Sequence, residues 1–430
     1  MNRIILVGNG FDLAHNLRTS YKDFIEWYWN SWLDNLREYY GTKKEDDFFS
    51  IELSAQFEFW ADIFQYLRNV ISNDTSFHEF IETAERYGYK IKKTYKSHFF
   101  ENINKSIDTK GWVDIENEYY KQLIEDKNTT KLNDEFDSLR KLLIQYLNEQ
   151  EEHISEIINN TIQQHILSPI YDNEIAISER NKWIEFLKHR NGYRGDSEHY
   201  DFWVELLNCY YNNDWAKSSF DAIRSFEKEF ELQIENYGIA SVPIESFPDA
   251  YLLPDRILLL NFNYTKVADK YLPNAERFST IHIHGELSDP NSIIFGYGDE
   301  KDKEYNGIID KNDNEYLRHM KQPHYSESDN YRRMLAFVES APYQVYIMGH
   351  SCGNSDRTLL NTLFEHPNCV SIKPFYYVNK ESGKDNYLDI VQNISRNFTD
   401  AKKMRDRVVN KMYCQPLPQL TVNMSDTHSS

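Results

Sequence analysis

The sequence opens with a short apolar run that ends in two glycines, Arg3-Ile4-Ile5-Leu6-Val7-Gly8-Asn9-Gly10-Phe11-Asp12. Such a run of aliphatic residues is typical of a buried parallel strand. Two glycines one residue apart let the backbone turn sharply and approach a ligand closely, and a following helix would point its N-terminal N–H groups at an anion. The stretch therefore predicts either a phosphate-binding loop or only a tight turn between a strand and a helix.

Length and composition predict a folded protein. A chain of 430 residues is long enough for two or three domain-sized units, and 15% aromatic content excludes a disordered chain. The formal charge of −20 would repel a nucleic-acid backbone, so nucleic acid is not an expected partner. No stretch approaches the ~20 apolar residues of a membrane helix or resembles a signal peptide, so we expect a cytoplasmic protein without membrane contact.

The cysteine and histidine spacings do not predict a metal site. The four cysteines lie far apart and include no C-x-x-C pair: Cys209, Cys352, Cys369 and Cys414. Reduced thiols are therefore expected, without a zinc ribbon or a disulfide framework. His282 and His284 could supply half of a metal site, but no third ligand is suitably spaced, so no metal is expected.

The first half of the chain predicts mostly helix. Ser20 and Asp23 have the spacing of a capping box, so a helix should begin just after Ser20. From about residue 52 to about residue 237 nearly every periodic segment predicts helix, including 53–70, and glycine and proline are scarce. We therefore expect residues 26–249 to form a large, all-helical insertion domain.

Two carboxylates interrupt this helical pattern, in the segment Gly111-Trp112-Val113-Asp114-Ile115-Glu116. If the segment is extended, Asp114 and Glu116 share a face, and if it is helical they do not. The simpler interpretation is a solvated helix start, whose acidic side chains are stabilised by the helix dipole. Both interpretations stay open at this point.

Prolines at positions 243, 248 and 254 mark a return to strands. The strands predicted after them are 257–260, 280–284, 292–298, 343–348 and 370–378, and the helices are 357–365 and 386–395. Strands that alternate with helices in this way predict an α/β domain with an open parallel sheet. We expect this domain to comprise residues 1–25 and 250–420, and residues 421–430 to be a mobile tail.

Several of these strands end in loops that carry Gly, Asn, His or Asp. Ligands of open α/β sheets bind beyond the carboxyl ends of the strands, so these loops should converge on the Gly8–Asp12 stretch. The dinucleotide fingerprint of dehydrogenases requires a third glycine where this chain has Leu13, which disfavours hydride transfer. Asp356 is most simply an acid at a helix N-terminus, although it too would overlook the ligand end of the sheet.

Five ordered motifs together resemble the AbiH family of bacterial phage abortive-infection proteins. They are Val7-Gly8-Asn9-Gly10-Phe11-Asp12, Trp112-Val113-Asp114-Ile115-Glu116, Asn261-Phe262-Asn263-Tyr264, His284-Gly285 and Gly349-His350-Ser351. That family is in turn similar to the sirtuin-like (SIR2) NAD-binding fold. The resemblance therefore implies a sirtuin-like open parallel sheet with a Rossmann-type nucleotide site.

The resemblance also implies roles for individual residues. Asn263 would face the nicotinamide ribose, His284 would act as a base or orient the ribose, and Asp12 would polarise a water or accept from a ribose hydroxyl. The remaining residues implied to contact NAD are Gly8, Asn9, Gly10, Phe11, Asn261, Gly349, His350, Ser351 and Asp356. Thr265 stands where the sirtuin loop has an acid, and the zinc-binding cysteine pairs are missing, so the resemblance does not extend to protein deacylation.

The leading hypothesis is an antiphage effector that hydrolyses NAD+ to nicotinamide and ADP-ribose. NAD+ would be the substrate and no cofactor would be required, because expelling neutral nicotinamide needs a positioned ribose and a directed water and does not need a strong acid. An amide such as Asn263 can grip a hydroxyl, and His284 can move a proton near neutral pH. We expect a homo-oligomer that responds to a phage-derived trigger protein.

Two alternatives stay open. The same pocket could be a sensor that holds NAD+ or an ADP-ribose-derived signal without cleaving it, which Thr265 in place of an acid favours. A nuclease using Asp114, Glu116 and Asp356 around a metal is the other alternative, and the net charge of −20 disfavours it.

Overall fold

The computed structural model describes residues 1–54, 59–125, 128–154, 158–191 and 197–420. The predicted mobile tail, 421–430, lies outside the described residues. The helices in the described parts are α1 (Asn9–Ala14), α2 (Tyr21–Arg37), α3 (Trp60–Leu67), α4 (Phe77–Arg86), α5 (His98–Lys110), α6 (Ile115–Glu125), α7 (Thr129–Glu151), α8 (Asn160–Ile166), α9 (Arg180–Asn191), α10 (Ser197–Tyr210), α11 (Asn213–Glu229), α12 (Glu231–Tyr237), α13 (Tyr305–Asp310), α14 (Lys321–His324), α15 (Asn330–Ser340), α16 (Arg357–Glu365), α17 (Tyr387–Asn397) and α18 (Ala401–Arg407). None of these helices is both long and apolar enough to cross a membrane.

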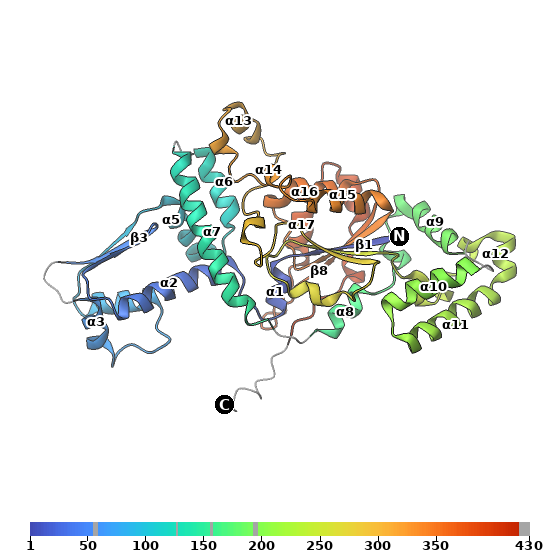
Figure 1. The fold of residues 1–430 in the computed structure, drawn as a ribbon, viewed down its shortest axis with the longest axis horizontal. Helices are drawn as coiled ribbons and strands as arrows, with labels where there is room; N and C mark the ends of the chain where they lie inside the picture. The colour runs from blue at the N-terminus through green and yellow to red at the C-terminus, as the bar shows by residue number, and fades with distance from the viewer. Residues whose placement is uncertain (55–58, 126–127, 155–157, 192–196, 421–430) are drawn as a thin grey trace.

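A five-stranded parallel sheet forms the centre of the molecule (Figure 1). Its strands are β1 (Asn2–Val7), β5 (Ile257–Asn261), β6 (Phe278–His282), β7 (Tyr343–Met348) and β8 (Cys369–Phe375). Their order across the sheet is β6-β5-β1-β7-β8, and every neighbouring pair is parallel. The predicted α/β class with an open parallel sheet is therefore confirmed, with each of these strands within a few residues of its expected place.

The strand order fixes where a ligand site can form. Counted along the chain as first to fifth, the strands lie in the order 3-2-1-4-5, which is the order of Rossmann-type sheets. The chain therefore leaves β1 toward one edge of the sheet, and later crosses back to build β7 and β8 on the other side. At the carboxyl ends of β1 and β7 the flanking connections diverge, and this divergence leaves a crevice.

Both faces of the sheet are buried, because side chains of a strand alternate between its two faces. Ile5 and Val7 of β1 pack in one core with the helices α8–α12. Ile4 and Leu6 pack in another core with α15, α16 and α17. A strand that is covered on both faces is apolar at nearly every position, which explains the run Ile4–Val7 at the start of the chain.

A third core holds α2–α7 together with the segment 287–320. This part lies to one side of the sheet, and α9–α12 lie on the other side (Figure 1). The helix α2 begins at Tyr21, and the predicted capping box is confirmed: the Ser20 Oγ accepts from the Asp23 N–H at 3.1 Å.

The insertion is not all-helical, so that part of the fold prediction is wrong. An antiparallel sheet of β2 (Lys43–Glu45), β3 (Phe49–Leu53) and β4 (Ile91–Tyr95) lies within it. The Phe49–Leu53 stretch alternates apolar and polar residues, a period of two that indicates a strand. The lysine-rich β2 and β4 carry little apolar signal, and they are strands because they pair with β3.

The predicted strand at 292–298 is also absent. The residues Ile293, Ile294 and Phe295 are buried as expected, but as an irregular segment that forms no ladder. Its backbone hydrogen bonds go elsewhere: the Ile294 N–H donates to the His284 carbonyl, and the Gly296 N–H donates to the Glu116 carboxylate. Apolar character alone therefore did not distinguish a buried loop from a strand.

Candidate functional site

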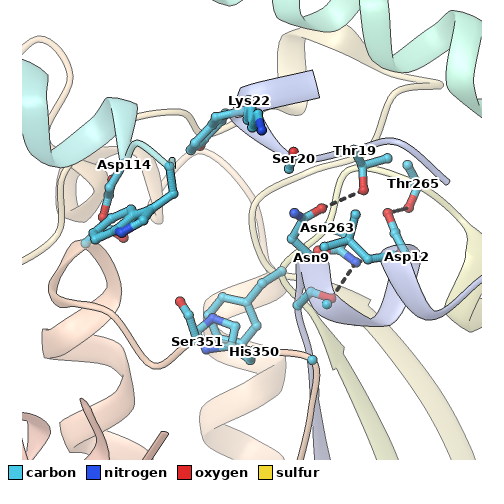
Figure 2. Close-up of a pocket in the computed structure, with 18 of the residues that line it drawn as sticks. Asn9, Asp12, Thr19, Ser20, Lys22, Asp114, Asn263, Thr265, His350 and Ser351 are labelled. Atoms are coloured by element: carbon cyan, nitrogen blue, oxygen red, sulfur yellow. Dashed lines mark hydrogen bonds between the residues drawn. The ribbon is translucent and has the colours of Figure 1, made fainter. Parts of the chain in front are cut away.

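A cavity of about 800 Å³ opens at the carboxyl edge of the main sheet, where β1 and β7 are neighbouring strands. Figure 2 shows residues that line it. Loops that follow β1, β5, β7 and β8 line it on the sheet side, and the segment before α6 lines it from the insertion. Its volume lies within the range of small-molecule sites, about 300–1,000 Å³. The position is the one at which Rossmann-type sheets bind ligands.

The predicted glycine loop is a tight turn. The helix α1 begins at Asn9, directly after Gly8, and the Gly10 N–H donates to the Gly349 carbonyl at 2.8 Å. A Cβ on Gly349 would lie 2.1 Å from the Phe11 nitrogen, and one on Gly8 would lie 2.5 Å from the His350 Cα. The absence of side chains at these glycines therefore lets the loops after β1 and β7 touch. This agrees with the tight turn between a strand and a helix that the sequence suggested. A role of the loop in phosphate binding stays a prediction.

Asp12, Asn263 and Thr265 form one hydrogen-bonded group on the floor of the cavity, which we call the Asp12 cluster. The Thr265 Oγ1 donates to one oxygen of Asp12 at 2.6 Å, and the Asn263 Nδ2 donates to the other at 2.8 Å (Figure 2). The same Nδ2 donates to the Gly8 carbonyl at 3.0 Å. Both hydrogens of the Asn263 amide are thus committed, and the orientation of its carbonyl oxygen is fixed.

Burial raises the pKa of the Asp12 carboxyl to about 7, although the hydrogen bonds from Thr265 and Asn263 oppose this shift. A carboxyl with such a pKa exchanges its proton near neutral pH. The site therefore has an acid although Thr265 stands where an acid was expected, because Thr265 donates to the carboxylate of Asp12, which helix α1 supplies.

Asn261 and Phe11 do not line the cavity, unlike the other residues expected from the sequence. Asn261 fixes the backbone of the loop that follows β5. Its Oδ1 accepts from the Asn263 N–H at 3.0 Å, and its Nδ2 donates to the Thr265 carbonyl at 3.1 Å. Phe11 is fully buried and packs against Tyr271. Both residues hold the site in shape from outside it.

Asn9 lies at the opposite end of the turn from Asp12 and lines the cavity. Its Oδ1 accepts from the Thr19 Oγ1 at 2.6 Å (Figure 2). This bond ties the start of α1 to the loop that leads into α2, so Thr19, Ser20 and Lys22 complete this part of the wall.

A second polar group, which we call the Lys321 cluster, is built around a fully buried ammonium. The Lys321 Nζ lies 2.7 Å from the Asp356 Oδ1 and 3.2 Å from the Glu116 Oε1. The same Asp356 Oδ1 lies 3.3 Å from the His284 Nε2, and its Oδ2 lies 3.5 Å from the His350 Nε2. Asp356 therefore joins two histidines and a lysine that come from three separate segments of the chain.

The charges in the Lys321 cluster follow from these distances. Burial opposes ionisation of Asp356, but the nearby Lys321 holds the pKa of that carboxyl well below its usual range. Glu116 lies farther from Lys321, and burial raises its pKa to about 7. Burial and the Lys321 charge lower the pKa of His284 to about 3, so its imidazole is neutral at pH 7.

The tautomer of His350 follows from its contacts. Its Nδ1 accepts from the Cys352 N–H at 3.0 Å, so the proton of the neutral ring lies on Nε2, which faces Asp356. Asp356 is the last residue of a short 3₁₀ turn, Asn354–Asp356, and α16 follows it directly. Because α16 comprises Arg357–Glu365, the predicted helix 357–365 is confirmed. The acid is not merely a partner of the helix dipole, because its carboxylate pairs with the Lys321 ammonium and lies within 3.5 Å of two histidine rings.

The segment before α6 is the insertion's contribution to the cavity. The Asp114 Oδ1 accepts from the Asn117 N–H at 3.0 Å, so the predicted helix start is confirmed. Glu116 is buried, however, and the expectation of a solvated helix start is wrong for it. Lys321 occupies the space between Glu116 and Asp356, and no group of three or more His, Cys, Asp or Glu residues in the described parts of the chain could hold a metal ion.

Sequence reasoning missed Lys321. It lies in Met320-Lys321-Gln322-Pro323, which has no spacing or composition that marks a buried cation. The signal that could have pointed to it is indirect: Asp114, Glu116 and Asp356, if brought together, require a counter-charge in a low-dielectric site.

The fold and the cavity define a Rossmann-like α/β protein with a cavity at the switch point of its parallel sheet. The family model described as "Bacteriophage abortive infection AbiH" matches residues 4–378, so the chain belongs to the AbiH family. This membership implies a role in abortive infection by bacteriophage. Comparison with curated proteins and with solved structures finds no match in either set.

Proposed function

We propose that this AbiH protein acts in abortive infection by hydrolysing NAD+ to nicotinamide and ADP-ribose in the cavity between β1 and β7. The observation that carries the proposal is the convergence of Asn263, His284 and Asp12 at the switch point of a parallel sheet. A dinucleotide fits such a crevice, and depletion of NAD+ would stop the metabolism on which a phage depends.

In the proposed reaction the bond between nicotinamide and C1′ of the ribose breaks, and its electron pair leaves with neutral nicotinamide. A water oxygen bonds to C1′ and releases a proton. The fixed carbonyl oxygen of Asn263 is suited to accept from a ribose hydroxyl or from this water. The neutral His284 can take up the proton, and Asp356 at 3.3 Å would stabilise the imidazolium that results.

Asp12 supports this assignment as a positioning residue. It accepts from the Asn263 amide and so sets the direction of the Asn263 carbonyl. Positioning of this kind contributes to catalysis because a displacement of about 1 Å can cost ~10²-fold in rate.

The direct test is to incubate the purified full chain with NAD+ and to quantify nicotinamide and ADP-ribose by liquid chromatography. We expect release by wild type, and a loss of at least about 10²-fold in His284→Ala and in Asn263→Ala. His153→Ala is the matched control, because His153 is exposed and does not line the cavity.

Absence of turnover by wild type, both alone and with lysate of phage-infected cells, would contradict the proposal. Full activity in His284→Ala would contradict it equally. Circular dichroism of each variant separates a lost reaction from a lost fold, which matters because Asn263 holds the Gly8 carbonyl and Asp12.

A second candidate is a sensor that binds NAD+ or an ADP-ribose-derived signal without cleaving it. The observation in its favour is that the polar groups of the Asp12 cluster satisfy one another, while the low pKa of His284 makes it a weak base. Thermal stabilisation by ADP-ribose without product from NAD+ would favour it. A ligand at 100 times its dissociation constant would add about 2.7 kcal/mol to the free energy of unfolding.

A further inference from the structure

Trp112 stands out among the eight tryptophans, all of which lie in the described residues. Its side chain is 61% exposed and lines the cavity. Within the described parts of the chain it makes no ring contact, accepts or donates no hydrogen bond and belongs to no core. An exposed aromatic side chain that has no packing role and also lines a cavity is placed to contact a bound ligand.

The backbone around Trp112 is fixed on both sides. Gly111 ends α5 in a left-handed conformation, with φ of 77°, and its N–H donates to the Ile107 carbonyl. Val113 is buried in the core of the insertion, and Asp114 caps α6. The turn therefore projects Trp112 from a rigid base, and ordering it on binding would cost little entropy.

The wall that carries Trp112 faces the catalytic side of the cavity. Figure 2 shows Asp114 across the pocket from Asp12 and Asn263. Glu116, further along the same segment, pairs with Lys321 beside His284. A ring that stacks on Trp112 would thus lie between this wall and the residues proposed to hold the ribose.

We infer that Trp112 stacks on the nicotinamide ring of the ligand and is the insertion's own specificity residue. This inference rests on the proposed NAD+ site. An indole face attracts a planar ring, and it attracts a positively charged ring more strongly because of its quadrupole. The oxidised nicotinamide is a planar cation, and the carboxylate of Asp114, which lies on the same wall and lines the cavity, favours it over a neutral ring.

The test uses small probes that lack the bond between nicotinamide and ribose, so the proposed hydrolysis cannot consume them. Ligand-observed NMR titrations of the full chain would compare 1-methylnicotinamide, which is cationic, with nicotinamide, which is neutral, and with AMP, which carries adenine. We expect 1-methylnicotinamide to bind more tightly than nicotinamide. Its affinity should fall about 5- to 150-fold in Trp112→Ala, the range that aromatic stacking supports, and be largely restored in Trp112→Phe.

Trp215→Ala is the matched control, because Trp215 is 66% exposed but does not line the cavity. It should bind all three probes as wild type does, and Trp112→Ala should bind AMP as wild type does. The inference is overturned if 1-methylnicotinamide binds Trp112→Ala as tightly as wild type, if AMP alone loses affinity, or if wild type binds neither ring.

The outcomes also separate this inference from the proposed hydrolysis. Binding of 1-methylnicotinamide that depends on Trp112, without turnover of NAD+, would support the ring subsite and contradict the hydrolysis. Turnover of NAD+ with an unchanged KM in Trp112→Ala would support the hydrolysis and contradict the ring subsite.

Discussion

The substitution Asp12→Asn tests whether the buried carboxyl of the Asp12 cluster carries a stability cost at neutral pH. The pKa of Asp12 is raised to about 7 by burial, whereas an aspartate in an unfolded chain has a pKa of about 3.9. The folded state therefore binds more protons than the unfolded state between these values. Stability from this residue is highest below pH 4 and is lost as the pH rises toward and through 7.

The magnitude follows from the two pKa values. A difference of about 3 pKa units corresponds to about 4 kcal/mol of lost stability at high pH. Of this, about 1.5 kcal/mol is already lost at pH 5, so about 2.5 kcal/mol is lost between pH 5 and pH 8. An asparagine does not ionise, and its Oδ1 can still accept from Asn263 while its Nδ2 donates to the Thr265 hydroxyl.

The assay is urea unfolding of wild type and Asp12→Asn at pH 5, 6, 7 and 8. We expect the stability of the variant, relative to wild type, to rise by about 2.5 kcal/mol from pH 5 to pH 8. Asp34→Asn is the matched control, because the Asp34 side chain is 76% exposed, and its curve should run parallel to that of wild type. A pH-independent difference between Asp12→Asn and wild type would refute the argument from burial.

Two further predictions concern the packing and the charges of the site. Gly349→Ala should lower the melting temperature far more than Gly383→Ala, because both glycines have positive φ but only the Cβ at 349 would meet backbone, at 2.1 Å from Phe11; equal losses in thermal unfolding would contradict this. Lys321→Met should destabilise the protein by about 3–5 kcal/mol at pH 7, because it leaves Asp356 buried without its cation, and the loss should shrink at pH 4 if protonation of Asp356 replaces the pair. An equal loss at pH 4 and pH 7 in urea unfolding would exclude that explanation.

Much of the main sheet could be predicted because its strands are buried on both faces. Such strands are near-continuous apolar runs, and the strands at 257–260 and 343–348 could therefore be recognised in the sequence. The capping box at Ser20 was equally readable, because its two partners are three residues apart. The strand at 49–53 was missed inside a helical block, and the run at 292–298 was mistaken for a strand, because burial alone does not specify backbone pairing.

The candidate site could be predicted only where residues follow strands. Asn263, His284 and the Gly349 turn were expected at one sheet edge because the carboxyl ends of parallel strands share that edge. The bond between Thr265 and Asp12 could not be predicted, because the two residues are 253 positions apart and neither has a distinctive spacing. The contribution of the insertion to the cavity could not be predicted either, because the sequence left open whether Asp114 and Glu116 share a face or lie at a solvated helix start.

The sequence alone indicated where the five strands of the main sheet lie and which polar residues end them, because hydrophobic patterning is a local property of the chain. It did not exclude the run at 292–298, because strand pairing is not local. Membership of the AbiH family is likewise carried by the order of the motifs along residues 4–378. Only the tertiary structure decided what these residues do to one another. It placed Lys321 between Glu116 and Asp356, and it exposed Trp112 at the cavity mouth. Charges and pKa values depend on distance and burial, and the fold alone sets both.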